Sequence, residues 1–160
     1  MTLVVARLRC RSALIGSLIE VFTIPLFGHL SDRFGRRALY FAGTIFTILF
    51  AFPLFWLIDT KNAFVIGATI AVALSFGHGM MFGLLSTYLP ELFGTRVRYT
   101  GASLGFQVAA AIGGGLSPVL ATSLTSSMGG TAGVSVLLIL LASITLTATF
   151  FARETRDVVL

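Results

Sequence analysis

The sequence predicts an all-α membrane protein with five transmembrane helices. Three observations support this prediction: only 11% of the 160 residues are charged, 56% are apolar, and the charges lie almost entirely between five long apolar runs. A soluble domain has about 25% charged residues, so this chain lacks the polar side chains needed to cover a globular surface. The composition therefore excludes a soluble enzyme, a disordered tail and a disulfide scaffold.

Each apolar run is long enough to cross a bilayer as a helix. The runs cover residues 12–30, 38–58, 63–89, 100–127 and 131–152, and they contain one charged residue, Glu20. A helix needs roughly 20 residues to cross about 30 Å of hydrocarbon. The runs are continuous and do not alternate between apolar and polar residues, which favours helices over barrel strands. We interpret residues 1–160 as a single membrane domain.

Charged residues and prolines set the limits of these runs in order. A basic segment, 31–37, separates the first run from the second, and a connection containing Lys61 separates the second from the third. Pro90 is expected to end the third run because proline cannot continue the hydrogen bonds of a helix. A second basic segment, 90–99, precedes the fourth run, and the fifth ends before Arg153.

The distribution of lysine and arginine predicts the orientation. Segments 31–37 and 90–99 and the C-terminal tail carry seven basic residues, whereas the two connections on the other side carry only Lys61. Short basic loops remain in the cytoplasm, so these three segments are predicted to be cytoplasmic. In this scheme three N-terminal arginines fall on the opposite side, namely Arg7, Arg9 and Arg11. Either the start of the chain is abnormal or a further helix precedes the first run, and we favour the further helix.

Several functions are excluded by the absence of the required residues. The single cysteine, Cys10, cannot form an internal disulfide, and His29 and His78 do not form a zinc-binding motif. The net charge of +5 comes from small arginine clusters and not from a basic stripe, so nucleic-acid binding is not expected. No catalytic acid–base set or phosphate-binding loop is present, so we predict no enzymatic activity, no metal and no cofactor.

The decapeptide 28–37 has the strongest motif, Gly-His-Leu-Ser-Asp-Arg-Phe-Gly-Arg-Arg. Gly35 permits a turn with positive φ. Asp32 is a candidate to cap the start of the next helix. The three arginines of the motif, Arg33, Arg36 and Arg37, can bind carboxylates or the C-terminal carbonyls of helices, and they also hold the segment in the cytoplasm.

This decapeptide resembles the signature loop of the major facilitator superfamily, which lies between helices two and three and again between helices eight and nine. A second motif begins at Glu91 and places Arg98 after six intervening residues, as in the loop between helices ten and eleven of sugar porters. The continuation 99–107 is most similar to the metabolite:proton symporters, a family that includes carriers of proline and betaine, shikimate, and 2-oxoglutarate. The resemblance covers residue 12 to the C-terminus and implies helices eight to twelve, part of the C-terminal half.

The resemblance implies that charged residues of the two motifs latch the cytoplasmic gate of a transporter. This network consists of Asp32, Arg33, Gly35, Arg36, Arg37, Glu91 and Arg98. If the two segments adjoin, Glu91 can pair with Arg36 or Arg37, and Asp32 with a basic neighbour. The alternative is that the arginines only set the topology.

Three residues within the runs are candidates for contact with a substrate or a proton. Glu20 is costly in lipid and should face a cavity or a partner, unless it lies near the outer third of its helix and is half hydrated. His78 either contacts the substrate or the proton, or it packs against a neighbouring helix. Gly77 and Gly79 allow such a helix to approach. Gln107 faces a central cavity or forms an interhelical hydrogen bond.

Some glycines in the third and fourth runs have a simpler structural explanation. Gly79 and Gly83 are four residues apart, and so are Gly101 and Gly105. Small residues at this spacing allow neighbouring helices to approach closely in a membrane. Both pairs are therefore predicted to lie at helix contacts.

The expected function is that of a fragment of a secondary active transporter in the bacterial inner membrane. By resemblance, the parent protein carries a small polar metabolite, an organic acid or a zwitterion, together with a proton by alternating access. Its partners are the lipid bilayer, the metabolite, the proton and the missing N-terminal half. The alternative is a truncated, non-transporting membrane subunit that associates with another carrier.

Overall fold

The computed structural model describes residues 2–60 and 62–152, with side chains from residue 14 onward. The helices are α1 (Thr2–Phe34), α2 (Arg36–Ile58), α3 (Ala63–Val72), the π-helix η1 (Ala73–Gly79), α4 (Met80–Glu91), α5 (Arg98–Met128) and α6 (Ala132–Phe151). Because α3, η1 and α4 follow one another without a break, we call residues 63–91 the third span. The described residues contain no strand, and the predicted all-α class is confirmed.

Five stretches are long and apolar enough to cross a membrane: 14–34, 36–58, 63–91, 98–128 and 132–151. Each corresponds to one predicted run, but four of them extend beyond it into charged residues. A helix satisfies its backbone hydrogen bonds in water as well as in lipid, so the first charge does not have to end it. Pro90 lies in the last turn of α4, which continues to Glu91, so the prediction that Pro90 ends the helix is wrong by one residue.

The segment 31–37 is not a loop, contrary to our prediction. Gly35 is its one non-helical residue, with φ of 96°, and helices run directly up to it and away from it. No side chain caps the start of α2, so the predicted capping by Asp32 is also wrong. Asp32 lies in the last turn of α1, and its carboxylate binds Arg36 instead.

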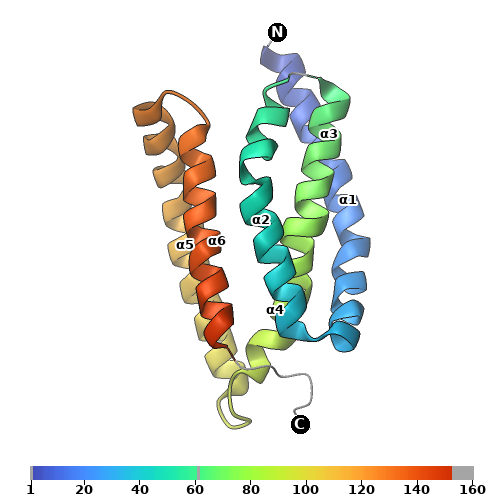
Figure 1. Ribbon diagram of the computed structural model, residues 1–160, viewed down its shortest axis with the longest axis vertical. Coiled ribbons are helices and arrows are strands. Elements are labelled where there is room, and N and C mark those ends of the chain that lie inside the picture. Colours follow the sequence, from blue (N-terminus) through green and yellow to red (C-terminus); the bar gives the residue numbers. More distant parts are fainter. Residues whose placement is uncertain (1, 61, 153–160) are drawn as a thin grey trace.

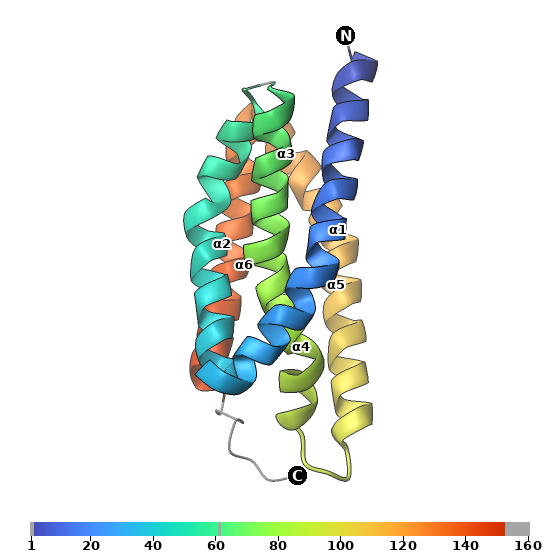
Figure 2. The same cartoon turned by 90° about the vertical axis from the view of Figure 1, so that its right-hand side faces the viewer.

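The helices run up and down beside one another (Figures 1 and 2). α1 packs along the third span, and α2 packs along α6, while α5 contacts only α6 and α4 among the described elements. The main buried apolar cluster is formed by Phe27, Leu39 and Leu84, from α1, α2 and α4. On the outside, large apolar side chains such as Phe22 and Trp56 are exposed, as expected for surfaces that face lipid.

The α1–α2 joint, the α4–α5 connection and the end of α6 lie at one end of the bundle, and α1 begins at the other (Figures 1 and 2). The two basic segments, 31–37 and 90–99, therefore share one end, as the charge distribution requires. The tail from residue 153 and the side chains of Arg7, Arg9 and Arg11 lie outside the described residues. The cytoplasmic location of this end remains a prediction.

Candidate functional site

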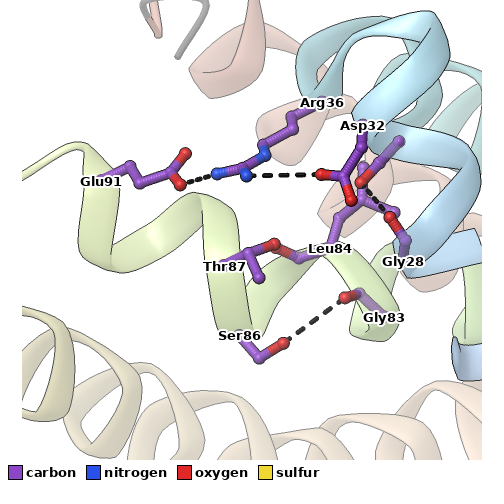
Figure 3. A network of polar contacts seen from close by, with 9 residues as sticks. Gly28, Asp32, Arg36, Gly83, Leu84, Ser86, Thr87 and Glu91 are labelled. Carbon is purple, nitrogen blue, oxygen red and sulfur yellow. Dashed lines mark hydrogen bonds and ion pairs between the residues drawn. The ribbon is translucent and has the colours of Figure 1, made fainter. Parts of the chain in front are cut away.

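Three charged side chains meet where α1 and α4 end and α2 begins (Figure 3). Arg36, the first residue of α2, lies between Asp32 of α1 and Glu91 of α4. Its Nη2 lies 3.4 Å from Oδ1 of Asp32, and its Nη1 forms an ion pair with Oε1 of Glu91. One guanidinium thus connects the ends of three helices.

The two carboxylates differ in their exposure to solvent. The side chains of Arg36 and Glu91 are 16% and 10% exposed, whereas that of Asp32 is 62% exposed. Water screens the Asp32 contact, so it contributes at most about 1 kcal/mol. The Arg36–Glu91 pair is largely desolvated, and loss of either partner would leave a buried charge without compensation.

The helix dipoles oppose all three charges. Asp32 and Glu91 lie in the last turns of α1 and α4, where the dipole is negative, and Arg36 lies at the positive start of α2. Each charge is therefore unfavourable at its own helix end, and the opposite charges of the neighbouring helices compensate for it. The cluster depends on the three ends remaining together.

Close packing of α1 against α4 brings these ends together. A Cβ atom on Gly83 would lie 2.7 Å from the carbonyl oxygen of Ile24, and one on Gly28 would lie 3.7 Å from the carbonyl oxygen of Gly83. Ser31 Oγ donates a 2.6 Å hydrogen bond to the carbonyl oxygen of Gly28 in its own helix, so this hydroxyl needs no acceptor from α4. This approach directs the end of α4, with Glu91, toward Arg36.

The other predicted gate residues lie apart from this cluster. Arg37 donates a hydrogen bond to α6, with 2.6 Å between its Nη2 and the carbonyl oxygen of Phe150. Arg33 is exposed in the last turn of α1, where the dipole favours a cation. Arg98 begins α5, and its Nε is buried without a hydrogen-bond partner in the described part of the chain. The structure thus joins Asp32, Arg36 and Glu91 and leaves these three arginines outside.

A second ionisable contact lies within the membrane-spanning part of the same helices. Glu20 of α1 contacts Nδ1 of His78 in η1 through its Oε1. The Glu20 side chain is 13% exposed and that of His78 is 56% exposed. This contact fits the expectation that Glu20 faces a partner.

Gly79 and η1 shape the surroundings of this pair. A Cβ on Gly79 would lie 3.1 Å from Thr23 Oγ1 and 3.8 Å from Glu20 Cγ, so the glycine makes room for α1. The His78 ring stacks on Phe82, with ring centroids 5.1 Å apart. His78 also lines a cavity of about 430 Å³ between α2, the third span and α6. It is therefore accessible from the side opposite Glu20's helix.

Gln107 lies elsewhere, on the exposed surface of α5. It lines a groove of about 470 Å³ between α4 and α5, together with Ser86 and Ser103. This groove shares Phe82 and Leu85 with the cavity beside His78. The structure thus places Gln107 in an adjoining space, and not in contact with Glu20 or His78.

The sequence analysis did not predict the Glu20–His78 pair, the π-helix or the contact of Arg37 with α6. The Glu20–His78 pair could have been proposed, because ionisable residues in a membrane tend to pair and these two were the obvious candidates. No comparable signal marks residues 73–79 as a π-helix. The division of Arg36 and Arg37 between different helices also depends on which elements pack beside α2.

Comparison with known proteins places these features in context. The sequence model of the Major Facilitator Superfamily matches residues 12–158 of this chain. The chain is 38% identical over 117 residues to the shikimate transporter of Escherichia coli (strain K12), covering 73% of this chain and 26% of that protein. It is 38% identical over 134 residues to an inner membrane metabolite transport protein of the same strain, covering 83% and 30%.

A third relative is the citrate-proton symporter of Klebsiella pneumoniae, which is 34% identical over 116 residues, covering 72% of this chain and 26% of that protein. The chain therefore spans less than a third of the length of these three relatives. All three are transporters and not enzymes. No solved structure matches the chain.

Proposed function

The chain belongs to the Major Facilitator Superfamily, and on that premise we propose that it is part of a secondary transporter. The transporter carries a small polar metabolite, an organic acid or a zwitterion, together with a proton. The metabolite carriers among the relatives support this proposal, and one of them is a proton symporter. The observation that carries it is the position of Arg36 between Asp32 and Glu91, where α1 and α4 end and α2 begins.

In this proposal the cluster is a gate. Alternating access requires a contact that holds helix ends together in one state and breaks in the other. Separating α2 from α4 would break the Arg36–Glu91 pair and hydrate both charges. The pair exists only in the closed state, so it biases the equilibrium between the two states toward closure. Arg33 and Arg98 would find their partners in the N-terminal half.

We assign the proton to the Glu20–His78 pair. A carboxylate and an imidazole in contact within a membrane change their joint charge when they bind a proton. The pair joins α1 to the third span, so that change acts on two spans that both end at the gate. Gln107 is the candidate for substrate contact, because it lines the adjoining groove with two serine hydroxyls.

The proposed location is the bacterial inner membrane, with the α1–α2 joint, the α4–α5 connection and the C-terminus in the cytoplasm. The shared position of the first two at one end of the bundle supports this orientation. Labelling with an impermeant thiol reagent tests it, with single cysteines introduced at Arg33 and Thr60 in a chain that carries Cys10→Ser. The cysteine at position 60 should react from outside intact cells, and that at position 33 only after the cells are opened.

Uptake by a chimera tests the function. The part of this chain that matches the Escherichia coli shikimate transporter replaces the corresponding segment of that protein, and uptake of labelled shikimate is measured in cells that lack their own carrier. We expect uptake that a protonophore abolishes, and Glu20→Gln should remove its dependence on external pH. The chain alone should give no uptake.

Two outcomes would contradict the proposal. One is a chimera that reaches the membrane in normal amounts but does not transport. The other is transport that a protonophore does not affect. If the chain alone co-purifies with an unrelated carrier and changes its activity, the chain is a non-transporting subunit instead.

A further inference from the structure

Arg37 binds the C-terminal end of α6, although it is adjacent to Arg36 in sequence. Its Nη2 donates a 2.6 Å hydrogen bond to the carbonyl oxygen of Phe150. Its Cζ lies 5.5 Å from the ring centroid of Phe41 and 5.7 Å from that of Phe150. Carbonyls in the last turn of a helix have no partner within the helix, and the dipole there favours a cation. Arg37 therefore caps α6 from the neighbouring helix.

A second hydrogen bond joins the same two helices near their other ends. Ser135, in the first turn of α6, donates from Oγ to the carbonyl oxygen of Ala51 in α2 at 3.3 Å, and it shares this one proton with the carbonyl oxygen of Thr131 at 3.4 Å. Both residues are buried, at 1% and 0% exposed. The two bonds run in opposite directions: α2 donates at one end, and α6 donates at the other.

The positions of the two bonds match along both helices. Arg37 and Ala51 are fourteen residues apart in α2, and Ser135 and Phe150 are fifteen residues apart in α6. At about 1.5 Å per residue these separations are about 21 and 22 Å. Both bonds can therefore form together in one register of the antiparallel pair. A slide by one residue would strain or break them both.

We propose that Arg37 is a positioning residue that fixes the register of α6 against α2, so that the two helices move as one body. The adjacent arginines then have separate tasks. Arg36 binds carboxylates, which can separate from it when helix ends part. Arg37 binds a backbone carbonyl, which does not titrate and moves only with its helix. If the proposed gate function holds, α6 follows α2 when the Arg36–Glu91 pair opens.

Distance measurement between α2 and α6 tests this proposal without any transport assay. Spin labels are attached at Ala42→Cys and Ala148→Cys, both exposed, in the full chain carrying Cys10→Ser and inserted in lipid nanodiscs. We expect one narrow distance distribution. Arg37→Gln should broaden it at least twofold or shift it by at least one residue rise, about 1.5 Å. The matched neighbour Arg36→Gln should leave it unchanged.

Conservative variants separate positioning from a general loss of folding. Arg37→Lys should keep the narrow distance distribution of the unmodified position, because its ammonium group can still donate a hydrogen bond to the carbonyl oxygen of Phe150. Ser135→Ala removes the other bond and should also broaden the distribution, which provides a reading if Arg37→Gln does not fold. An unchanged distribution in both variants would overturn the proposal, as would equal broadening by Arg36→Gln. A loss of transport with α2–α6 distances intact would bear on the gate alone.

Discussion

The third span and α5 each carry two glycines at the same four-residue spacing, but the surroundings of these glycines differ. In the third span, a Cβ on Gly83 would lie 2.7 Å from a backbone oxygen of α1, and one on Gly79 would lie 3.1 Å from Thr23 Oγ1. In α5, Gly105 has nothing within 4 Å, and Gly101 packs against the ring of Phe93 in the α4–α5 connection. The prediction of a helix contact therefore holds for the first pair and is wrong for the second among the described helices.

The difference shows that small-residue spacing permits a close approach but does not select the partner. α1 supplies that partner for the third span, and the resulting seam also carries the Glu20–His78 contact, while the Arg36–Glu91 pair joins α2 to the end of α4 beside it. α5 has one buried residue, Ala102, and its described contacts are limited to α6 and α4. We therefore expect substitutions on the seam to be costly and equivalent substitutions on α5 to be tolerated.

Glu91→Gln should have the largest effect, because it leaves the guanidinium of Arg36 largely buried without its main carboxylate. We expect the free energy of unfolding to fall by about 3 kcal/mol. Asp32→Asn is the matched control, since it removes the exposed carboxylate from the same arginine and should cost less than about 1 kcal/mol. Unfolding in mixed micelles titrated with sodium dodecyl sulfate measures both. Equal losses would show that burial does not distinguish the two contacts.

Gly83→Ala is expected to follow, since the added methyl group meets the backbone of α1, which cannot rotate away. Overpacking of this kind lowers the free energy of unfolding by about 1–3 kcal/mol. Gly105→Ala adds the same methyl group where no atom lies within 4 Å. It should raise stability by up to about 1 kcal/mol through helix propensity. If both substitutions change the free energy of unfolding in the same direction in the same assay, the distinction between the seam and α5 is wrong.

Glu20→Gln should have a smaller effect on stability. The amide can still form a hydrogen bond with His78, and interhelical hydrogen bonds in membranes average about 0.6 kcal/mol. We expect a loss of about 1 kcal/mol or less, together with the loss of pH-dependent uptake in the chimera. A large loss of stability without any change in the pH profile would indicate a packing role and not a proton site.

Gln107→Leu should have the smallest effect on stability, within about 0.5 kcal/mol, because the side chain is exposed on α5. In the chimera, however, the same change should raise the KM for the substrate, since the amide lines the groove proposed for binding. Gln107→Asn, which keeps the amide, serves as the control. Unchanged kinetics in the Leu variant would exclude Gln107 from the substrate site.

The number and order of the helices could be predicted from the sequence because the cost of charge in lipid limits each apolar run. The positions of the helix ends were predicted less accurately, because charges mark the edge of the hydrocarbon and not the end of the hydrogen-bonded backbone. Helices that include Arg36, Glu91 and Arg98 illustrate this point. The π-helix at 73–79 has no periodicity of its own that would distinguish it from an α-helix.

The candidate site was only partly predictable for a related reason. The motif identified the arginines, but the partner of each one depends on which helices pack around the start of α2. Arg36 faces α1 and α4, whereas Arg37 faces α6. Glu20 was recognisable as a costly charge, yet its pairing with His78 required the register of α1 against the third span.

The single non-helical residue between α1 and α2 has a consequence for biosynthesis. With only Gly35 between them, the two helices have too little connecting chain to enter the bilayer one after the other. We expect them to insert together as a helical hairpin. That tip carries Arg33, Arg36 and Arg37, and moving each guanidinium through the hydrocarbon would cost about 3 kcal/mol or more. We therefore expect the tip to stay on the side of the membrane from which the hairpin inserts.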